Sequence, residues 1–171
     1  MNNIKDINLS NTNDNFDTWI RDLNPENQKI LYEKDILILP ELNYGQTEGA
    51  SYHEDVIDFI DYLDEKNENL KYGFCSDNEK FLSLNNNDIW LGAFLIYAPQ
   101  LKSIALNVFI NLLSSYLYDK FLKFGKNPNI KCKLKVVKEK DKVSKTFEYD
   151  GDAKTLREIA PNIIESFNNA K

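Results

Sequence analysis

DIWLGAFLIYAPQLKSIALNVFINLLSSYLYDKFLKF, residues 88–124, is the most apolar stretch of this chain and the one that decides its fold. Pro99 is the strong helix breaker inside it, because a proline in a helix interior costs about 3 kcal/mol. The stretch therefore predicts two helices, one that ends near Ala98 and a second, at residues 99–124, with Pro99 in its first turn. The second is expected to end at Gly125, since glycine readily adopts the left-handed C-cap conformation.

The helix predicted at residues 99–124 bears a narrow polar stripe on an otherwise apolar surface. The stripe consists of Asn107, Asn111, Ser114 and Ser115. Such a stripe is typical of a mostly buried helix in a soluble protein, so we expect this helix to lie in the core. An interface with a partner or with a second copy of the chain is one alternative. Membrane insertion is another, but each uncharged run is shorter than the ~20 residues that a spanning helix needs.

Charge is divided unevenly along the chain. Residues 1–100 hold 19 acidic and 7 basic side chains, whereas residues 101–171 hold 8 and 14. The net charge of −6 argues against nucleic acid as a partner, because phosphate binding requires a basic surface. A basic part beside an acidic part instead favours electrostatic complementarity, either within the fold or toward a charged protein.

The length of the chain bounds the number of domains. With 171 residues, 42% of them hydrophobic, it can form one domain with a full core. We place this single α+β domain at residues 14–171, with an acidic part at 14–87, apolar helices at 88–124, and a basic hairpin and last helix at 129–169. The polar, Asn-rich residues 1–13 are expected to form a flexible N-terminus.

The acidic part begins with helical signals and then predicts a buried strand. Two short helices are expected, one after Asp14 and one that starts at Pro25. Residues 36–40, ILILP, lack polar alternation and predict a central strand buried on both faces. Further along, Ser51 and Glu54 have the spacing of a capping box, which predicts that a helix starts there.

The basic part predicts a β-hairpin and an amphipathic helix. Residues 130–136 alternate apolar side chains with Lys131, Lys133 and Lys135, the pattern of a half-buried strand with a lysine face. A second strand returns, and Asp152 is the expected N-cap of the final helix. Together these elements predict an α+β fold: a small mixed sheet with a long, largely buried central helix, a C-terminal β-hairpin and a C-terminal amphipathic helix.

Two charged clusters are the candidate contacts with a protein partner. They consist of Asp55, Asp58 and Asp61 on the acidic helix, and of Lys131, Lys133 and Lys135 on the hairpin. A solvated helix face is the simpler explanation of the carboxylates. For the lysines, a solvated edge strand that blocks sheet-to-sheet aggregation is one interpretation. An acidic protein partner is a second, and nucleic acid or anionic lipid is a third.

The loop at residues 41–51 is the alternative place for a ligand. Ligands of α/β sheets bind beyond the carboxyl ends of strands, often beside the N-terminus of a following helix. The residues that would contact a small molecule or nucleotide there are Tyr44, Glu48, His53 and Glu54. The loop lacks the glycine spacing of the phosphate-binding fingerprints, and Ile57 stands where a zinc-protease HExxH motif requires histidine.

The remaining chemistry-bearing residues predict neither a metal nor a cofactor. Cys75, Cys132 and the single histidine lack the close pairs of a zinc site, so we expect two buried free thiols. There is no nucleophile-elbow motif, and no apolar segment after Met1 suggests a secretory signal. These features favour a non-enzymatic, cytoplasmic protein that uses no cofactor.

The C-terminal part resembles a class of bacterial proteins. From residue 101 the order is apolar helix, basic strand, turn, strand, DGD and final helix, in LKSIALNVFINLLSSYLYDKF and IKCKLKVVKEKDKVSKTFEYDGDAKTLREIA. This order looks like small effector-associated accessory components of bacterial conflict, or anti-phage, systems. The resemblance covers residues 101–169, less than half of the chain, and carries over no site residue. It implies a non-enzymatic accessory subunit in a bacterial defence setting.

Three hypotheses about function follow. The first is a protein-interaction module, an accessory or immunity-like component of a defence system that binds another protein through charge complementarity. A homo-oligomer through the helix at residues 99–124 is a variant of this hypothesis. The second is a small-molecule or nucleotide-binding enzyme domain that uses the loop 41–51. The third is a membrane-perturbing effector subunit.

Overall fold

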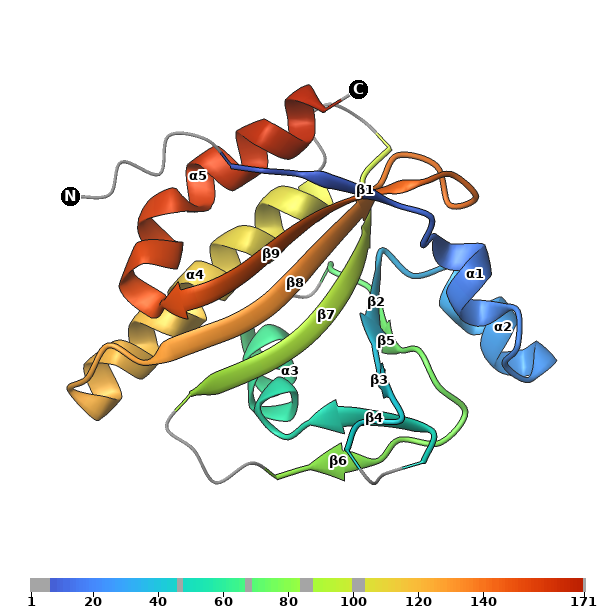
Figure 1. Cartoon of the computed structure of the whole chain (residues 1–171), viewed down its shortest axis with the longest axis horizontal. Coiled ribbons are helices and arrows are strands. Elements are labelled where there is room, and N and C mark those ends of the chain that lie inside the picture. The colour runs from blue at the N-terminus through green and yellow to red at the C-terminus, as the bar shows by residue number, and fades with distance from the viewer. Residues whose placement is uncertain (1–6, 46–47, 67–68, 84–87, 100–103, 171) are drawn as a thin grey trace.

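The computed structural model describes residues 7–45, 48–66, 69–83, 88–99 and 104–170, which form an α+β fold. Six strands make a mixed sheet in the order β1–β9–β8–β7–β2–β5 (Figure 1). In this order they span Ser10–Thr12, Ser144–Asp152, Asn129–Val137, Ile89–Tyr97, Ile36–Leu39 and Tyr72–Phe74. The sheet includes the predicted strand at residues 36–40 and the predicted hairpin, which are both confirmed.

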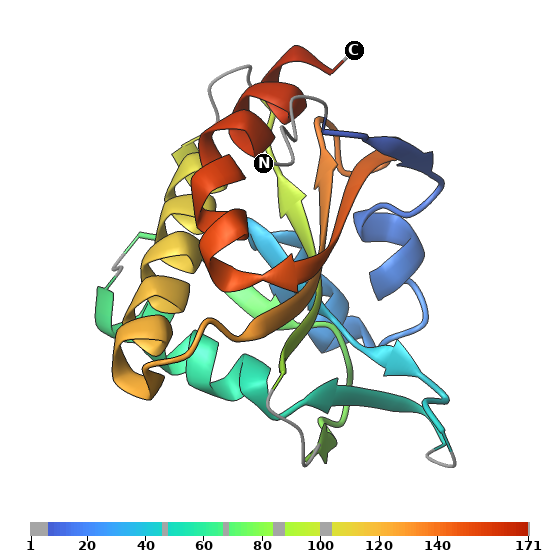
Figure 2. The same cartoon turned by 60° about the vertical axis from the view of Figure 1, so that its left-hand side comes forward.

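A smaller sheet and two layers of helices complete the fold. The small sheet joins β3 (Glu41–Leu42), β4 (Ala50–His53) and β6 (Phe81–Leu82). The helices are α1 (Phe16–Ile20), α2 (Pro25–Tyr32), α3 (Asp55–Lys66), α4 (Ile104–Phe124) and α5 (Ala153–Asn169). Figure 2 shows α3, α4 and α5 on one face of the large sheet and α1 and α2 on the other.

Strand β7 lies in the interior of the large sheet, where we predicted a helix that ends near Ala98. That prediction is wrong. The strand pairs with β2 on one side and β8 on the other. Both of its faces are covered, because Phe94 and Ile96 join the core beneath α3–α5 and Leu95 joins the core beneath α1 and α2. A strand buried on both faces has no polar alternation, so its sequence pattern cannot be distinguished from that of a buried helix.

A β-bulge interrupts β7 at Gly92. The register against β8 shifts between Trp90 and Gly92, and Gly92 has a φ of +74°, a conformation that favours glycine. As a result Leu91 and Phe94, three positions apart, both enter the core beneath the long helices. Trp90 and Ala93 both line the opposite face. The bulge therefore decides which face of the sheet receives the tryptophan.

Helix α4 is the buried central helix that the sequence predicts. It lies against α3, α5 and β7, and Phe109 and Leu117 have no exposed surface. The predicted polar stripe is divided, because Asn111 is exposed whereas Oδ1 of Asn107 is buried without a hydrogen-bond partner in the described structure. Residues 100–103 of the predicted helix lie outside the described residues.

Lys140 ties the hairpin turn after β8 to helices α1 and α2. Its Nζ lies 5.0 Å from the ring centroid of Phe16 and 4.8 Å from those of Tyr32 and Tyr97. It also donates a hydrogen bond to the Tyr32 carbonyl. Each such cation–π contact stabilises by about 0.5–2 kcal/mol. Helices α1 and α2 are thus held over the end of the sheet that carries the hairpin turn (Figure 1).

Two further predictions about local structure are wrong. Ser10–Thr12, expected to be flexible, form the edge strand β1, which is antiparallel to β9. Ser51 and Glu54 form no capping box, because Ser51 belongs to β4 and α3 begins at Asp55. The predicted loop 41–51 therefore starts and ends in the strands of the small sheet. Pairing with Glu41 on β3 takes the place of the helix terminus predicted at Ser51.

The packing of α4 predicts a large difference between two substitutions on that helix. Phe109→Ala should lower the free energy of unfolding by about 3–5 kcal/mol, because it leaves a cavity in the core. Leu122→Ala should change it by less than about 0.5 kcal/mol, because Leu122 is 59% exposed. Urea unfolding of both variants measures the difference. Equal losses would contradict the placement of α4 in the core.

Candidate functional site

Strand β8 presents its lysines on the face of the sheet opposite to α3–α5. Ile130 and Leu134 point into the helical core, whereas Lys131, Lys133 and Lys135 alternate with them and line the other face. The strand is interior, because it pairs with β7 and β9. The interpretation of these lysines as protection of an edge strand is therefore wrong.

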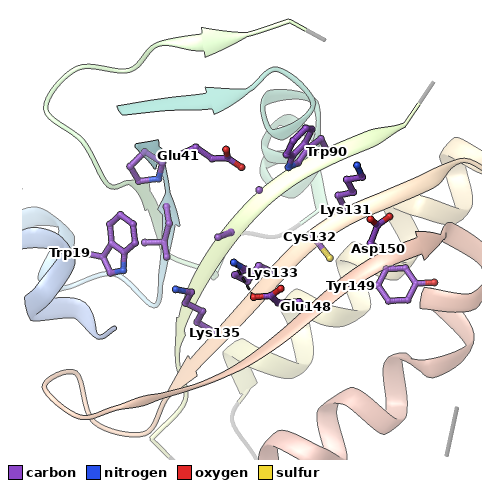
Figure 3. A pocket seen from close by; sticks show the side chains of 14 residues that line it. Trp19, Glu41, Trp90, Lys131, Cys132, Lys133, Lys135, Glu148, Tyr149 and Asp150 are labelled. Carbon is purple, nitrogen blue, oxygen red and sulfur yellow. Dashed lines mark ion pairs between the residues drawn. The ribbon is translucent and has the colours of Figure 1, made fainter. Parts of the chain in front are cut away.

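A hollow of about 440 Å³ lies over this face, between α1 and the small sheet (Figure 3). We term it the groove. Its charged and aromatic lining residues are Trp19, Glu41, Trp90, Lys131, Lys133, Lys135, Glu148, Tyr149 and Asp150. They come from α1, β3, β7, β8 and β9, so the groove is assembled from distant parts of the chain.

The three lysines of the groove have different partners. Nζ of Lys133 lies 3.0 Å from Oε1 of Glu148, directly across the hairpin, and both side chains are largely exposed. Lys135 pairs with Asp14, and its side chain is only 10% exposed. Nζ of Lys131 lies 5.1 Å from the ring centroid of Trp90. Lys131 lines the groove, and the described structure shows no carboxylate paired with it.

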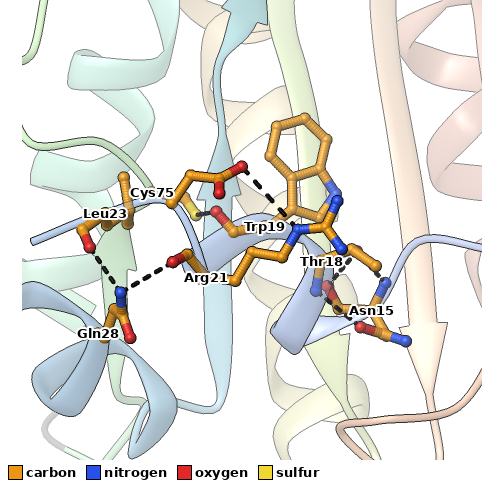
Figure 4. Close-up of polar contacts among 8 residues, drawn as sticks. Asn15, Thr18, Trp19, Arg21, Leu23, Gln28 and Cys75 are labelled. Carbon is orange, nitrogen blue, oxygen red and sulfur yellow. Dashed lines mark hydrogen bonds and ion pairs between the residues drawn. The ribbon is translucent and has the colours of Figure 1, made fainter. Parts of the chain in front are cut away.

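Trp19 forms one end of the groove, and the local structure of α1 fixes its position (Figure 4). Helix α1 begins with a capping box in which the Thr18 N–H donates to Oδ1 of Asn15 over 2.9 Å. The thiol of Cys75 donates to the Trp19 carbonyl over 3.5 Å. Nε1 of Trp19 is buried without a partner in the described structure, so one hydrogen-bond donor at this end is unsatisfied.

Trp90 forms the other end of the groove and belongs to an aromatic stack. The His53 ring lies parallel to it at a centroid distance of 4.0 Å, and the Tyr44 ring meets both edge-on. Nε2 of His53 lies 3.2 Å from Oε1 of Glu41. Beneath the stack, the backbone N–H of Trp90 donates to the Asp55 carboxylate over 2.8 Å. This cluster connects the small sheet to the large sheet.

The structure brings together only some of the residues predicted around the loop 41–51. Tyr44 and His53 meet in the aromatic stack. Glu48 and Glu54 have exposed side chains and are not among the residues that line the groove. His53 is 3% exposed, so the imidazole is enclosed by the protein rather than presented to a ligand.

The predicted acidic cluster is not a uniform solvated face. Asp55 accepts the Trp90 N–H, and burial raises the pKa of this carboxyl. Burial alone would also raise the pKa of Asp58, but hydrogen bonds from Lys120 and Tyr116 outweigh it and lower that pKa. Asp61 is exposed. Two of the three carboxylates thus accept internal hydrogen bonds, and Asp55 and Asp58 also line a separate hollow of about 670 Å³.

The described residues contain no cluster of three or more His, Cys, Asp or Glu side chains that could hold a metal ion. None of the helices in the described ranges is long and apolar enough to cross a membrane. Cys75 and Cys132 are free and buried, as predicted, and burial raises the pKa of each thiol to about 12. Neither thiol is therefore activated as a nucleophile.

Sequence reasoning missed most of the groove. Trp19, Trp90 and Glu41 stand far apart in the sequence, and no local pattern connects them. Glu148 and Asp150 could have been found, because alternation along the predicted hairpin places them opposite Lys133 and Lys131. The lysine row was identified, but its counter-charges were not.

The chain was compared with protein-family models, curated proteins and solved structures, and none of them matches it. The geometry of the described residues therefore carries the functional argument.

The contacts of Asp55 predict a pH-dependent effect of Asp55→Asn, which keeps an acceptor for the Trp90 N–H. The raised pKa means that the folded protein binds this proton more tightly than the unfolded chain. The wild-type protein therefore loses stability as the pH rises from 3.8 through the folded pKa. We expect the variant to be more stable than the wild type at pH 7 and the difference to shrink toward pH 4.

Urea unfolding at a series of pH values measures this difference. Asp61→Asn is the matched control on the same helix, and its effect should stay within about 0.5 kcal/mol at every pH. A variant that is less stable than the wild type at pH 7 would show that burial does not dominate the energetics of Asp55.

Proposed function

We propose that this chain is a non-enzymatic protein-interaction module that binds an extended acidic segment of another protein in the groove. The observation that carries the proposal is the lysine row of β8, which lines an open hollow between the two tryptophans of the chain. Alternate side chains of a strand stand about 6.6 Å apart. An extended partner with carboxylates at alternate positions matches this spacing.

The ion pairs of the groove indicate which lysines can take up a partner. Lys131 faces the groove without a carboxylate partner in the described structure. The pair of Lys133 with Glu148 is exposed, and exposed ion pairs contribute at most about 1 kcal/mol, so a partner carboxylate can replace Glu148 at little cost. Lys135 and Asp14 are more buried, and their pair serves mainly to hold the N-terminal segment on the sheet.

The carboxylates of the groove favour a protein partner over nucleic acid. Glu41, Glu148 and Asp150 line the same hollow as the lysines. A phosphate backbone that follows the lysines would also lie beside these carboxylates, and like charges in contact cost several kcal/mol. A protein segment can place its carboxylates over β8 and neutral or basic side chains over β9. The net charge of −6 also disfavours binding of nucleic acid.

The biological setting of this proposal is a cytoplasmic accessory or immunity-like component of a bacterial defence system. The resemblance of residues 101–169 to such components supports it, and two free buried thiols suit a reducing compartment. A homo-oligomer through α4 has less support, because its core residues, such as Phe109 and Leu117, are already buried within the chain. An enzyme at the loop 41–51 also has less support, because a substrate would have to reach the enclosed His53.

Tryptophan fluorescence offers a direct test, because both tryptophans of the chain line the groove. A synthetic peptide with glutamate at alternate positions should change the emission, and the affinity should fall as salt increases. Lys131→Glu and Lys133→Glu should each weaken binding by about tenfold or more, since each places a like charge against the peptide. Fluorescence titration at several salt concentrations measures both effects.

Lys154→Glu is the matched control, because Lys154 is an exposed lysine outside the groove lining. It should leave the affinity within about twofold of the wild type. The same peptide with glutamine in place of glutamate should not bind. Equal binding by the glutamine peptide, or tighter binding of a single-stranded oligonucleotide, would overturn the proposal.

A further inference from the structure

Lys138 lies on the other side of the sheet, directly after the end of β8. It lines a small hollow of about 200 Å³ together with Val136, Val143 and Phe167. Lys145, which stands opposite Val136 on β9, also lines this hollow. The hollow is separate from the groove, because the two share none of their lining residues. It combines apolar walls with two lysine side chains.

The amine of Lys138 is buried without a hydrogen-bond partner in the described structure. Water no longer solvates an ammonium ion that is buried without a counter-charge, so the charged form is disfavoured. Burial accordingly lowers the pKa of Lys138. The Lys138 amine is therefore neutral in a larger fraction of molecules than the amine of an exposed lysine. The neutral amine is the nucleophilic form.

Other buried or paired lysines have interaction partners for their amines in the described structure. Lys133 and Lys135 are paired with carboxylates. Burial also lowers the pKa of Lys140, but its amine donates to the Tyr32 carbonyl and lies over three aromatic rings. Lys138 thus combines burial, an apolar hollow and the absence of a partner in the described structure.

We infer that Lys138 is a nucleophilic amine that captures small aldehydes carrying an acidic group. The nitrogen lone pair attacks the carbonyl carbon, and the carbonyl π electrons move to oxygen, which takes up a proton from the nitrogen through water. Loss of water from this carbinolamine leaves a C=N bond, an imine, between Lys138 and the aldehyde carbon. No oxidant or reductant is required for this step.

Lys145 provides the preference for an acidic aldehyde. Its Nζ donates to Oδ1 of Asn11, a neutral partner that leaves the positive charge available. Because Lys138 and Lys145 line the same hollow, an aldehyde that reacts with Lys138 can place a carboxylate beside Lys145. The apolar side chains of Val136 and Phe167 suit the body of an aromatic or short aliphatic aldehyde.

The test is reductive labelling of the folded protein at pH 7 with 4-carboxybenzaldehyde and cyanoborohydride, which delivers hydride to the imine carbon and fixes the adduct. Peptide mass mapping then gives the labelling rate of each of the 19 lysines. We expect Lys138 to react severalfold faster than the exposed Lys29, because burial enlarges the neutral fraction of Lys138. Labelling of Lys138 at the rate of Lys29 or slower would overturn the inference.

Two variants separate the contributions of the two lysines. Lys138→Met should fold with equal or greater stability, because it removes a buried charge, and should lose the fast-labelled site. Lys145→Gln should slow the reaction of Lys138 with 4-carboxybenzaldehyde severalfold. The rate at which Lys138 reacts with benzaldehyde should stay unchanged. Equal slowing with both aldehydes would overturn the assignment of an acidic ligand. Neither variant changes the groove lining, so its peptide binding should persist.

Discussion

The burial of β7 on both edges and both faces is the constraint on which the rest of the structure depends. Its neighbours β2 and β8 satisfy the backbone hydrogen bonds on both sides. Helices α3–α5 bury one face, which holds Phe94, while α1 and α2 bury part of the other, which holds Leu95. Because α1 and α2 cover only one end, the other end of that face stays open, and the groove forms there.

Charged side chains on an interior strand need a physical explanation, because such positions are usually apolar. The lysines of β8 are tolerated because their face is open to solvent and because Glu148 and Asp150 stand opposite them on β9. The tryptophans at either end add apolar surface to an otherwise polar hollow. A face that is polar, hollow and flanked by aromatic residues differs from a core face and from a plain solvated surface. This combination supports a binding role.

The sequence predicted the local elements of the C-terminal half well. The hairpin, the N-cap at Asp152 and the apolar face of α5 each depend on neighbouring residues, and all were found. The prediction failed at residues 89–97, where an uninterrupted apolar run fits both a helix and a doubly buried strand. It also failed at Ser10–Thr12, whose strand exists only because the edge of β9 is available for pairing.

The sequence by itself determined the fold class, the lysine row and the two inert thiols, because these follow from local periodicity and composition. The tertiary structure alone decided that Trp19, Trp90 and Glu41 meet those lysines, and that Asp55 and Asp58 are committed to internal hydrogen bonds. The reason is physical. Alternation along a strand fixes which side chains share a face, but only the pairing of β7 with β8 and the position of α1 fix what that face encloses.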